Sequence, residues 1–320
     1  MLPPAPLLVR DRLIGGLVGL VIGDALGVPV EFGGRAERDH DPVRGMRGFG
    51  THGQPVGAWS DDGALAMAHA AAFVAHGWDP QRHLEAFAAW AERGAWTAHG
   101  RVFDIGITTQ SALRRFRSGT PIDRIGGAGV RDNGNGSLMR ILPASCWWAA
   151  ASVEERITGV MAASALTHAH ARARLCCAWH AQICAGLLAM RPVAEGLGTA
   201  AAALEGRVPP EECDVFEPLI DGSFLYLPRE HVRSDGYVVS TLTAAIWCLH
   251  RHDSYADAVL EAVNLGDDTD TTAAVTGGLA GLRCGLSGIP RAWIACLPRS
   301  VEVLGLAERF ADACLKMGAR

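Results

Sequence analysis

The chain has 320 residues, of which 49% are hydrophobic and 20% are charged, and this balance of an ordinary packed globular protein excludes long disordered regions. Its formal net charge of −5 argues against a general nucleic-acid-binding protein, which needs a basic face to neutralise phosphates. A small phosphate-bearing ligand stays compatible with this charge, since one local site or a bound cation reverses its sign.

Nine cysteines are scattered along the chain without any Cys-x-x-Cys pair. This pattern predicts reduced thiols rather than a disulfide framework or a zinc site. The first residues, MLPPAP, lack the basic region and apolar run of a secretory signal, and the apolar stretch at 13–23 is too short to cross a bilayer. We therefore predict a soluble, cytoplasmic protein with no membrane partner.

Helical signals begin early in the chain. A predicted helix at 12–26 is apolar and contains four glycines, whose spacing gives one smooth face on which another helix can pack closely. A dinucleotide-binding loop is not indicated, because no strand precedes these glycines. Further helices are predicted, in chain order, at 62–76, 82–93, 108–117, 152–166, 171–188, 240–251 and 255–263, with a last long helix at 271–284.

Glycine-rich loops separate these helices, at 45–57, 126–136 and 285–288. Strand signals are few, and the run at 237–239, Tyr-Val-Val, could equally begin a helix. No repeat of fixed period and no linker divides the chain. The predicted fold is therefore all-α, with a single compact multi-helix domain at 11–320 preceded by an N-terminal tail at 1–10.

The first cluster of oxygen donors is Ser60-Asp61-Asp62, at the start of the helix predicted at 62–76. Two carboxylates and one hydroxyl fall within one turn there. Helix capping explains this cluster if it is taken alone, because Ser and Asp are favoured at helix N-termini, where the helix dipole stabilises negative charge.

The second cluster, residues 267–272, carries three carboxylates and three hydroxyls at the start of the helix predicted at 271–284. One cap is enough for a helix, and crowding so many acids raises the cost of ionising them unless a cation compensates. Oxygen donors suit Mg²⁺, Mn²⁺ or Ca²⁺, whereas zinc favours His and Cys. A calcium loop is not indicated, because its glycine and its final glutamate are missing. Two such clusters, both opening helices, predict one shared two-metal centre.

Two further acids, Asp24 and Glu31, lie in apolar surroundings near the end of the first predicted helix. Structural hydrogen bonding is the favoured interpretation for Asp24. An apolar setting raises the pKa of a glutamate and suits it to proton transfer, which is the functional interpretation of Glu31.

The Gly/Asn-rich loop at 133–136 is predicted to open into a helix. Free backbone N–H groups at a helix start form a seat for phosphate, whereas an ordinary tight turn is the competing interpretation, and the sequence leaves both open. The segment at 104–109, DIGITT, has the same character with a carboxylate added. His168 and His170 would point to different faces of a helix, so they are a poor metal pair.

In the order in which they occur, these segments resemble the ADP-ribosylglycohydrolase family, and within it the bacterial dinitrogenase reductase-activating glycohydrolases. The resemblance covers roughly residues 12 to 295, nearly the whole chain. The matching segments are GDALG at 23–27 with Glu31-Phe32, WSDD at 59–62, DIG at 104–106, GNGSLMR at 134–140, Thr167-His168 and NLGDDTDT at 264–271.

The resemblance implies an all-helical fold with two divalent ions, Mg²⁺ or Mn²⁺, at the bottom of a cleft. The implied metal ligands are Ser60, Asp61, Asp62, Asp268, Asp270 and Thr271. Asp104 and Glu31 are the implied catalytic acid and base, and the sequence leaves open which is which. The implied substrate-binding residues, which would hold the diphosphate and the ribose or adenine, are Gly106, Thr108, Asn133, Gly134, Asn135, Gly136, Ser137, His168 and Tyr237.

The implied activity is metal-assisted hydrolysis at the anomeric carbon of the distal ribose, which releases ADP-ribose from an ADP-ribosylated protein or from a small ADP-ribose-containing substrate. ADP-ribosyl-arginine protein is the favoured substrate. Two alternatives stay open. One is a metal-dependent phosphoesterase acting on a nucleotide diphosphate, and the other is a non-catalytic ADP-ribose-binding or immunity-type protein.

Three residues depart from the pattern of the family, which usually has Thr in place of Ser60, Thr in place of Gly63 and Gly in place of Asp267. Ser60 keeps a hydroxyl, so it can still bind a metal. Gly63 loosens the first turn of its helix, and Asp267 is expected to add negative charge beside the metals. With these changes metal binding is still expected, whereas the exact substrate is left open.

Overall fold

A computed structural model describes residues 5–318 of the protein. Within this range the chain folds into α-helices joined by loops and short 3₁₀ turns, and it contains no β-strand, which confirms the predicted all-α fold. The helices are α1 (Pro6–Gly27), α2 (Arg35–His40), α3 (Asp61–His76), α4 (Pro80–Arg93), α5 (Ile107–Arg117), α6 (Leu142–Trp147), α7 (Val153–Ala165), α8 (Ala171–Leu188), α9 (Val193–Leu204), α10 (Cys213–Asp221), α11 (Val238–Arg251), α12 (Tyr255–Asn264), α13 (Thr269–Cys284), α14 (Arg291–Cys296) and α15 (Ser300–Gly318).

Every helix predicted from hydrophobic periodicity has a counterpart among these helices. The ambiguous run at 237–239 begins a helix, because α11 starts at Val238. The prediction that the last long helix lies at 271–284 is wrong, since α15 follows it. This amphipathic helix buries Val303 and Phe310, which lie two turns apart on the face that packs against α1 and α3.

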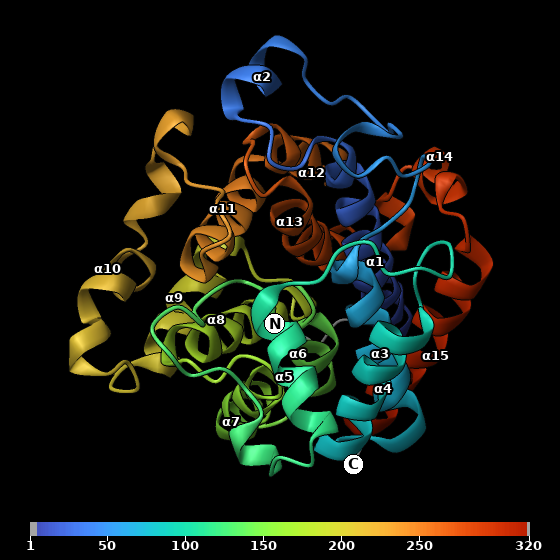
Figure 1. The fold of residues 1–320 in the computed structure, drawn as a ribbon. Helices are drawn as coiled ribbons and strands as arrows, with labels where there is room; N and C mark the ends of the chain where they lie inside the picture. The colour runs from blue at the N-terminus through green and yellow to red at the C-terminus, as the bar shows by residue number, and fades with distance from the viewer. Residues whose placement is uncertain (1–4, 319–320) are drawn as a thin grey trace.

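The apolar helix α1 and the glycine-rich helix α13 lie side by side in the middle of the fold (Figure 1). A Cβ atom on Gly19 would lie 2.4 Å from the backbone oxygen of Gly277, and one on Gly23 would lie 2.0 Å from that of Ala273. Since real Cβ atoms do not approach so closely, the two backbones touch only because side chains are missing there. The predicted smooth glycine face of the first helix is confirmed.

The first helix is longer than expected, so the prediction that it is too short to cross a bilayer has to be considered again. The segment Pro6–Val30 is long and apolar enough to cross a bilayer, but its most apolar window is 100% buried inside the fold, as in the core helix of a soluble protein. The cytoplasmic location stays a prediction. The tail was assigned to residues 1–10, whereas α1 already begins at Pro6, a residue type favoured at the first helical position. Residues 1–4 lie outside the described residues.

The C-terminal end of α1 fixes the starts of two other helices. Both carboxylate oxygens of Asp24 accept from the backbone N–H of Ser60, at 2.9 and 3.0 Å, and one also accepts from that of Gly63, at 2.7 Å. The structural interpretation of Asp24 is therefore confirmed. A Cβ on Gly27 would lie 2.3 Å from the Cα of Asp270, so the end of α1 also contacts the start of α13. One helix end thus holds both acidic clusters.

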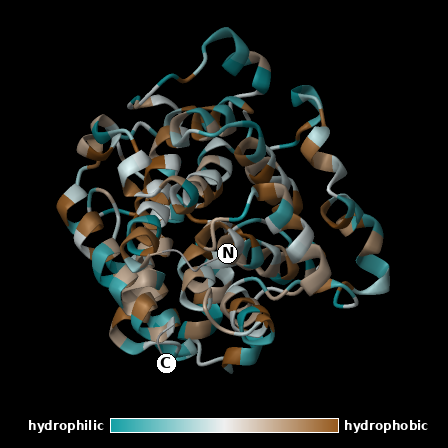
Figure 2. Cartoon of the chain, turned by 180° about the vertical axis from the view of Figure 1, so that it is seen from behind, coloured by the Kyte–Doolittle hydropathy of each residue, from teal (hydrophilic) through white to brown (hydrophobic). Residues whose placement is uncertain are grey.

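Residues 28–57, which we call the strap, connect α1 to α3 across one end of the molecule. The strap contains two short 3₁₀ turns, Val28–Val30 and Gly50–His52, with α2 between them. Hydrophilic residues dominate α2, which projects from the rest of the fold in both overall views (Figures 1 and 2).

Two side chains anchor the strap to the region around α12. The guanidinium of Arg35 donates to the backbone oxygens of Leu265, at 2.9 Å, and Arg229, at 2.6 Å. The side-chain amide of Asn264 accepts from the N–H of Val43, at 2.8 Å, and donates to its oxygen, at 3.0 Å. These bonds hold the strap in place beside the start of α13, so its side chains have fixed positions there.

Candidate active site

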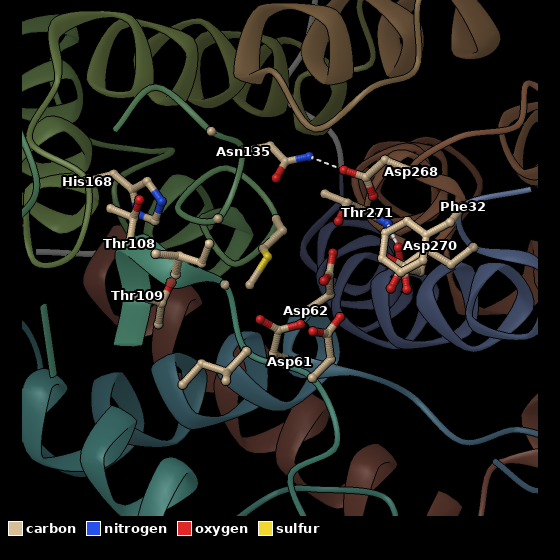
Figure 3. A pocket seen from close by; sticks show the side chains of 18 residues that line it. Phe32, Asp61, Asp62, Thr108, Thr109, Asn135, His168, Asp268, Asp270 and Thr271 are labelled. Carbon is tan, nitrogen blue, oxygen red and sulfur yellow. Dashed lines mark hydrogen bonds between the residues drawn. The ribbon is translucent and has the colours of Figure 1, made fainter. Parts of the chain in front are cut away.

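A cavity of about 350 Å³ opens where the N-termini of α3, α5 and α13 meet the strap. Its acidic lining residues are Glu31, Asp61, Asp62, Asp104, Asp268 and Asp270. Its other lining residues are Phe32, Ile105, Gly106, Ile107, Thr108, Thr109, Gly134, Asn135, Gly136, Met139, His168 and Thr271. Figure 3 shows the aspartates of α3 and α13 pointing toward one space. The two acidic clusters therefore meet in one cavity.

The first cluster begins α3, and only one of its three residues caps the helix. The Ser60 hydroxyl accepts from the backbone N–H of Asp62 at 3.3 Å, which is the expected N-cap bond. Asp61 and Asp62 lie in the first helical turn and are 6% and 1% exposed, yet both line the cavity. Ser60 itself is not among the lining residues.

The second cluster begins α13 without using a side chain as a cap. Asp268 occupies the N-cap position, but its carboxylate makes no capping bond. One of its oxygens instead accepts from the side-chain amide of Asn135, at 2.7 Å (Figure 3). Asp270 accepts from the backbone N–H of Thr271 at 2.8 Å. Capping is therefore not the reason for these acids, and the start of the helix dipole adds favourable potential for them.

Burial and mutual repulsion disfavour the charged forms of these acids. Burial, followed by repulsion from Asp104, raises the pKa of Asp61 to about 8 and that of Glu31 to about 9. Burial and neighbouring carboxylates also raise the pKa values of Asp62 and Asp270 well above their ordinary range. Among the described residues that line the cavity, none is Lys or Arg. The charge of this site thus calls for a cation from outside the chain.

The donor set of the cavity fits a divalent metal ion. Buried oxygens of Asp62 and Asp268 have no hydrogen-bond partner among the described residues, so each is free to accept a cation. Glu31, Asp268 and Asp270 offer ligand atoms that all lie within 4.8 Å of one another, and a second such group is Glu31, His52 and Asp104. Carboxylate oxygens are the ligands of Mg²⁺ and Mn²⁺. Glu31, which the sequence linked to proton transfer, therefore also lies where a ligand is needed.

The predicted phosphate seat differs in its details from expectation. The loop at 133–136 does not open a helix directly, because turns follow it and α6 begins only at Leu142. Gly134, Asn135 and Gly136 nevertheless line the cavity. A third helix start at the cavity, besides those of α3 and α13, is that of α5, whose N-cap is Gly106. Backbone N–H groups at the first turn of α5 can donate hydrogen bonds to an anion there.

Two residues that the sequence assigned to this seat do not line the cavity. The hydroxyl of Ser137 is fully buried and bonds the hydroxyl of Ser164 at 2.8 Å, so it does not line the cavity. The backbone oxygen of Asn133 accepts from the N–H of Val238 at 3.2 Å, and this residue does not line the cavity either. The sequence placed both residues in a loop whose backbone would hold a phosphate, and neither of them lines the cavity.

His168 lines the cavity, whereas Tyr237 does not. Burial lowers the pKa of His168 to about 3, which keeps its ring neutral. A Cβ on Gly136 would lie 2.9 Å from this ring, so a glycine is needed for the ring to reach the cavity wall. The hydroxyl of Tyr237 instead accepts from the guanidinium of Arg172 at 3.1 Å.

Several lining residues escaped sequence reasoning. Phe32 and Ile107, which are 69% and 83% exposed, are apolar side chains that line the cavity. Thr109, which is 1% exposed, follows the predicted Thr108 directly, so the DIGITT segment could have indicated it. His52 touches Glu31 from a loop whose path no sequence pattern predicts.

The structure explains two departures from the family pattern. A Cβ on Gly63 would lie 3.0 Å from an oxygen of Asp24, so a larger residue would press on the carboxylate that bonds the Gly63 N–H. Asp267 adopts φ +60°, a left-handed conformation that favours Gly and tolerates Asp. Its side chain is exposed and does not line the cavity. The expectation that Asp267 adds charge beside the metals is therefore not supported.

Comparisons with known proteins agree with this geometry. The model of the family described as ADP-ribosylglycohydrolase matches residues 5–319. An ADP-ribosylarginine hydrolase of Pseudomonas putida (strain GB-1) is 34% identical over 94% of this chain and 78% of its own length. The dinitrogen reductase ADP-ribosyl glycohydrolase of Rhodospirillum rubrum is 29% identical over 92% of each chain. A solved structure titled an ADP-ribosylglycohydrolase-related protein complex has a TM-score of 0.81 and 29% identity, covering 96% of this chain and 99% of its own.

Proposed function

The chain belongs to the ADP-ribosylglycohydrolase family and is therefore a hydrolase of ADP-ribosyl linkages, and we propose that it uses two divalent metal ions to release ADP-ribose from arginine-linked ADP-ribosylated protein. One observation carries the metal part of this proposal. Six buried or half-buried acids line one cavity, and no basic side chain is among the described lining residues. Such a surplus of carboxylates is stable when cations compensate it.

The proposed metal ligands come from both acidic clusters and from the strap. They are Ser60, Asp61, Asp62, Asp268, Asp270 and Thr271, with Glu31 added because its carboxylate lies within 4.8 Å of those of Asp268 and Asp270. Bound Mg²⁺ or Mn²⁺ supplies Lewis acidity toward ribose hydroxyls and water.

The remaining lining residues bind and orient the substrate. The first turn of α5 and the backbones of Gly134 and Gly136 offer N–H groups to the diphosphate, whereas the N–H of Asn135 already donates to Gly236. His168, neutral at physiological pH, offers its ring to the ribose. Cleavage at the anomeric carbon passes through a state with positive charge on the ring, which nearby carboxylates stabilise. Asp104 and Glu31 line the same cavity and are the candidates for moving the proton between water and the leaving nitrogen.

Arginine linkage is favoured by the relatives and by charge. The similar protein from Pseudomonas putida is named an ADP-ribosylarginine hydrolase. A guanidinium leaving group is cationic, and the cavity wall carries carboxylates without competing basic side chains. The acidic wall therefore complements this linkage better than it complements a neutral serine linkage.

The test is a hydrolysis assay on matched peptides that carry ADP-ribose on arginine or on serine, with and without Mg²⁺ or Mn²⁺. We expect free ADP-ribose, identified by mass, from the arginine-linked peptide and only when metal is added. Release of AMP would instead support phosphoester cleavage. Binding of ADP-ribose without any product would support a non-catalytic protein, and equal turnover without metal would overturn the metal proposal.

A further inference from the structure

Three consecutive residues of the strap, Gly50, Thr51 and His52, form a short turn that closes onto the segment Pro29–Glu31. Gly50 adopts φ +63°, and a Cβ there would lie 1.8 Å from the backbone oxygen of Pro29. The hydroxyl of Thr51 donates to the backbone oxygen of Glu31 at 2.7 Å. The imidazole of His52 then bonds the Glu31 carboxylate through its Nε2 atom. Each residue of this turn thus makes one contact with the segment that carries Glu31.

The ring of His52 is fixed from two further sides. Its centroid lies 6.0 Å from that of Phe32 and 5.4 Å from that of Phe103, with both rings tilted against it. The backbone oxygen of His52 accepts from the side-chain amide of Gln54 at 3.0 Å. A ring packed on two aromatic neighbours has few alternative rotamers, so its Nε2 atom is held at one place.

The carboxylate of Glu31 has a single side-chain hydrogen bond among the described residues, and His52 makes it. This carboxylate is 6% exposed and faces other acids. A carboxylate has two oxygens. His52 engages Oε2, which leaves the second oxygen without a side-chain hydrogen bond, and the carboxylate of Glu31 lies close to those of Asp268 and Asp270.

We propose that His52 is a positioning residue, which holds one oxygen of Glu31 so that the other is presented to the metal ion bound between Glu31, Asp268 and Asp270. The inference rests on the proposed metal site and specifies how this chain builds it. Without a donor at this position, repulsion from the neighbouring acids turns the Glu31 carboxylate away from the ion. Hydrogen bonds to a metal-binding carboxylate of this kind typically contribute about 10- to 100-fold to metal affinity.

Two substitutions separate the hydrogen bond from the packing of the ring. His52→Gln keeps an N–H donor at a similar reach and loses the ring, whereas His52→Phe keeps a ring between its aromatic neighbours and loses the donor. Gln54→Ala is the control for disturbance of the turn, because its side chain does not touch Glu31. Thermal unfolding of all variants reports whether the fold is intact.

The measurement is the affinity for Mn²⁺, followed by titration with electron paramagnetic resonance, together with kcat and KM for ADP-ribose release. We expect His52→Phe to weaken Mn²⁺ binding about 10- to 100-fold and to lower kcat more than it raises KM. We expect His52→Gln to recover most of both, and Gln54→Ala to stay within about twofold of wild type, as is usual for a change away from the site.

The outcomes of this experiment separate the two proposals. Wild-type affinity in His52→Phe, or equal losses in the Gln and Phe variants, would overturn the positioning role while leaving the proposed function intact. The expected order of Mn²⁺ affinities in a chain that cleaves no arginine-linked substrate would support the positioning role and overturn the proposed linkage. A wild-type chain that binds no Mn²⁺ would overturn the positioning role together with the metal proposal.

Discussion

The two halves of α3 bury ionisable side chains in opposite ways. At its start, Asp61 and Asp62 are almost fully buried in a cavity lined by further acids. Two turns later, His69 is 0% exposed, and its ring packs against those of His83, at 4.7 Å, and Phe73, at 4.9 Å. Both halves of α3 therefore bury polar groups away from water, but only the first half does so around a cavity.

This difference distinguishes a ligand-binding site from a structural core. Burial lowers the pKa of His69 well below its ordinary value and that of His83 to about 4, so both rings are neutral at pH 7. They also have backbone acceptors, the oxygens of Arg140, at 3.2 Å, and Gly77, at 3.1 Å. Each ring also keeps one buried nitrogen without a partner, as Asp62 keeps one oxygen, but both rings are neutral, whereas the acids place like charges together. A region whose buried ionisable groups are neutral and packed against other rings is structural, whereas a region that leaves like charges unpaired around a cavity expects a ligand.

The largest effect is expected in the acidic cavity, from Asp268, and the adjacent Asp267 provides the control. Asp268→Asn removes a charge from the cavity and should lower kcat/KM for ADP-ribose release about 10³-fold or more, since a metal ion contributes several kcal/mol to such a reaction. Asp267→Gly removes an exposed charge and suits φ +60°, so its rate should stay within about twofold of wild type. Equal losses in both variants would show that net charge, not the cavity, matters.

Removing the metal should lower the thermal stability of the protein, because the proposed cation binds in the acidic cavity at the start of α3. A cation that binds only the folded chain stabilises it by about 2.7 kcal/mol at a concentration 100 times its Kd. Mn²⁺ added to chelator-treated protein should therefore raise Tm by about 5 °C or more. The same addition should shift the Tm of Asp268→Asn much less. Differential scanning fluorimetry measures both, and identical shifts would place the stabilising ion elsewhere.

Acid should instead affect the buried histidines, His69 in α3 and His83 in α4. Below pH 6.5 the unfolded chain takes up protons on its histidines, whereas folded His83 stays neutral down to about pH 4. The unfolded state therefore binds more protons in this window, and the free energy of unfolding falls as pH drops through it. His83 alone should lower it by about 2 kcal/mol at pH 5 and by nothing above pH 6.5.

His83→Gln provides the comparison for this pH effect, because an amide can still donate to Gly77 and does not titrate. Urea unfolding at pH 5 and pH 7.5 should show a smaller acid-induced loss in this variant than in wild type. The acids of the cavity are present in both proteins, so their titration cancels in the difference. The same loss in both proteins would contradict a buried neutral His83.

The smallest effect compares two serines that cap helices. Ser60 begins α3 beside the cavity, and Ser152 begins α7 with a capping box on Glu155. Replacing either serine by Ala should cost about 1 kcal/mol of stability. Only Ser60→Ala should also lower turnover, because its hydroxyl is a proposed metal ligand, and Ser60→Thr should restore it. A turnover loss of the same size in Ser152→Ala would mean that stability alone explains the effect.

Local patterns predicted the helices and the acidic clusters, because both depend on residues close in sequence. Asp61, Asp62 and Asp270 all line the cavity as expected. Contacts between distant segments were not predictable in this way. Asn135 bonds Asp268 across 133 residues, and His52 reaches Glu31 through the path of a loop. Such pairings follow from how helices pack, which periodicity does not contain.

The positions of turns and helix starts were the other features that the sequence did not resolve. The Asn-Gly sequence at 133–136 is compatible with a tight turn and with a helix start, and the structure has turns followed by α6. Ser137 therefore points into the core, where it meets Ser164. The first turn of α5, which starts at Ile107 within the DIGITT segment, lies at the cavity. A single-residue shift in where a helix begins changes which N–H groups are free, and sequence signals do not resolve helix ends that finely.

The pairing of α1 with α13 has a consequence for synthesis. Gly15 and Gly281, whose backbones touch, are made far apart in time, because a ribosome adding about 5–20 residues per second needs roughly a quarter of a minute to a minute to travel between them. During that interval a long apolar helix has left the ribosome without the partner that covers its bare face. We therefore expect a chain truncated before α13 to expose the apolar face of its first helix, which is a surface that promotes aggregation.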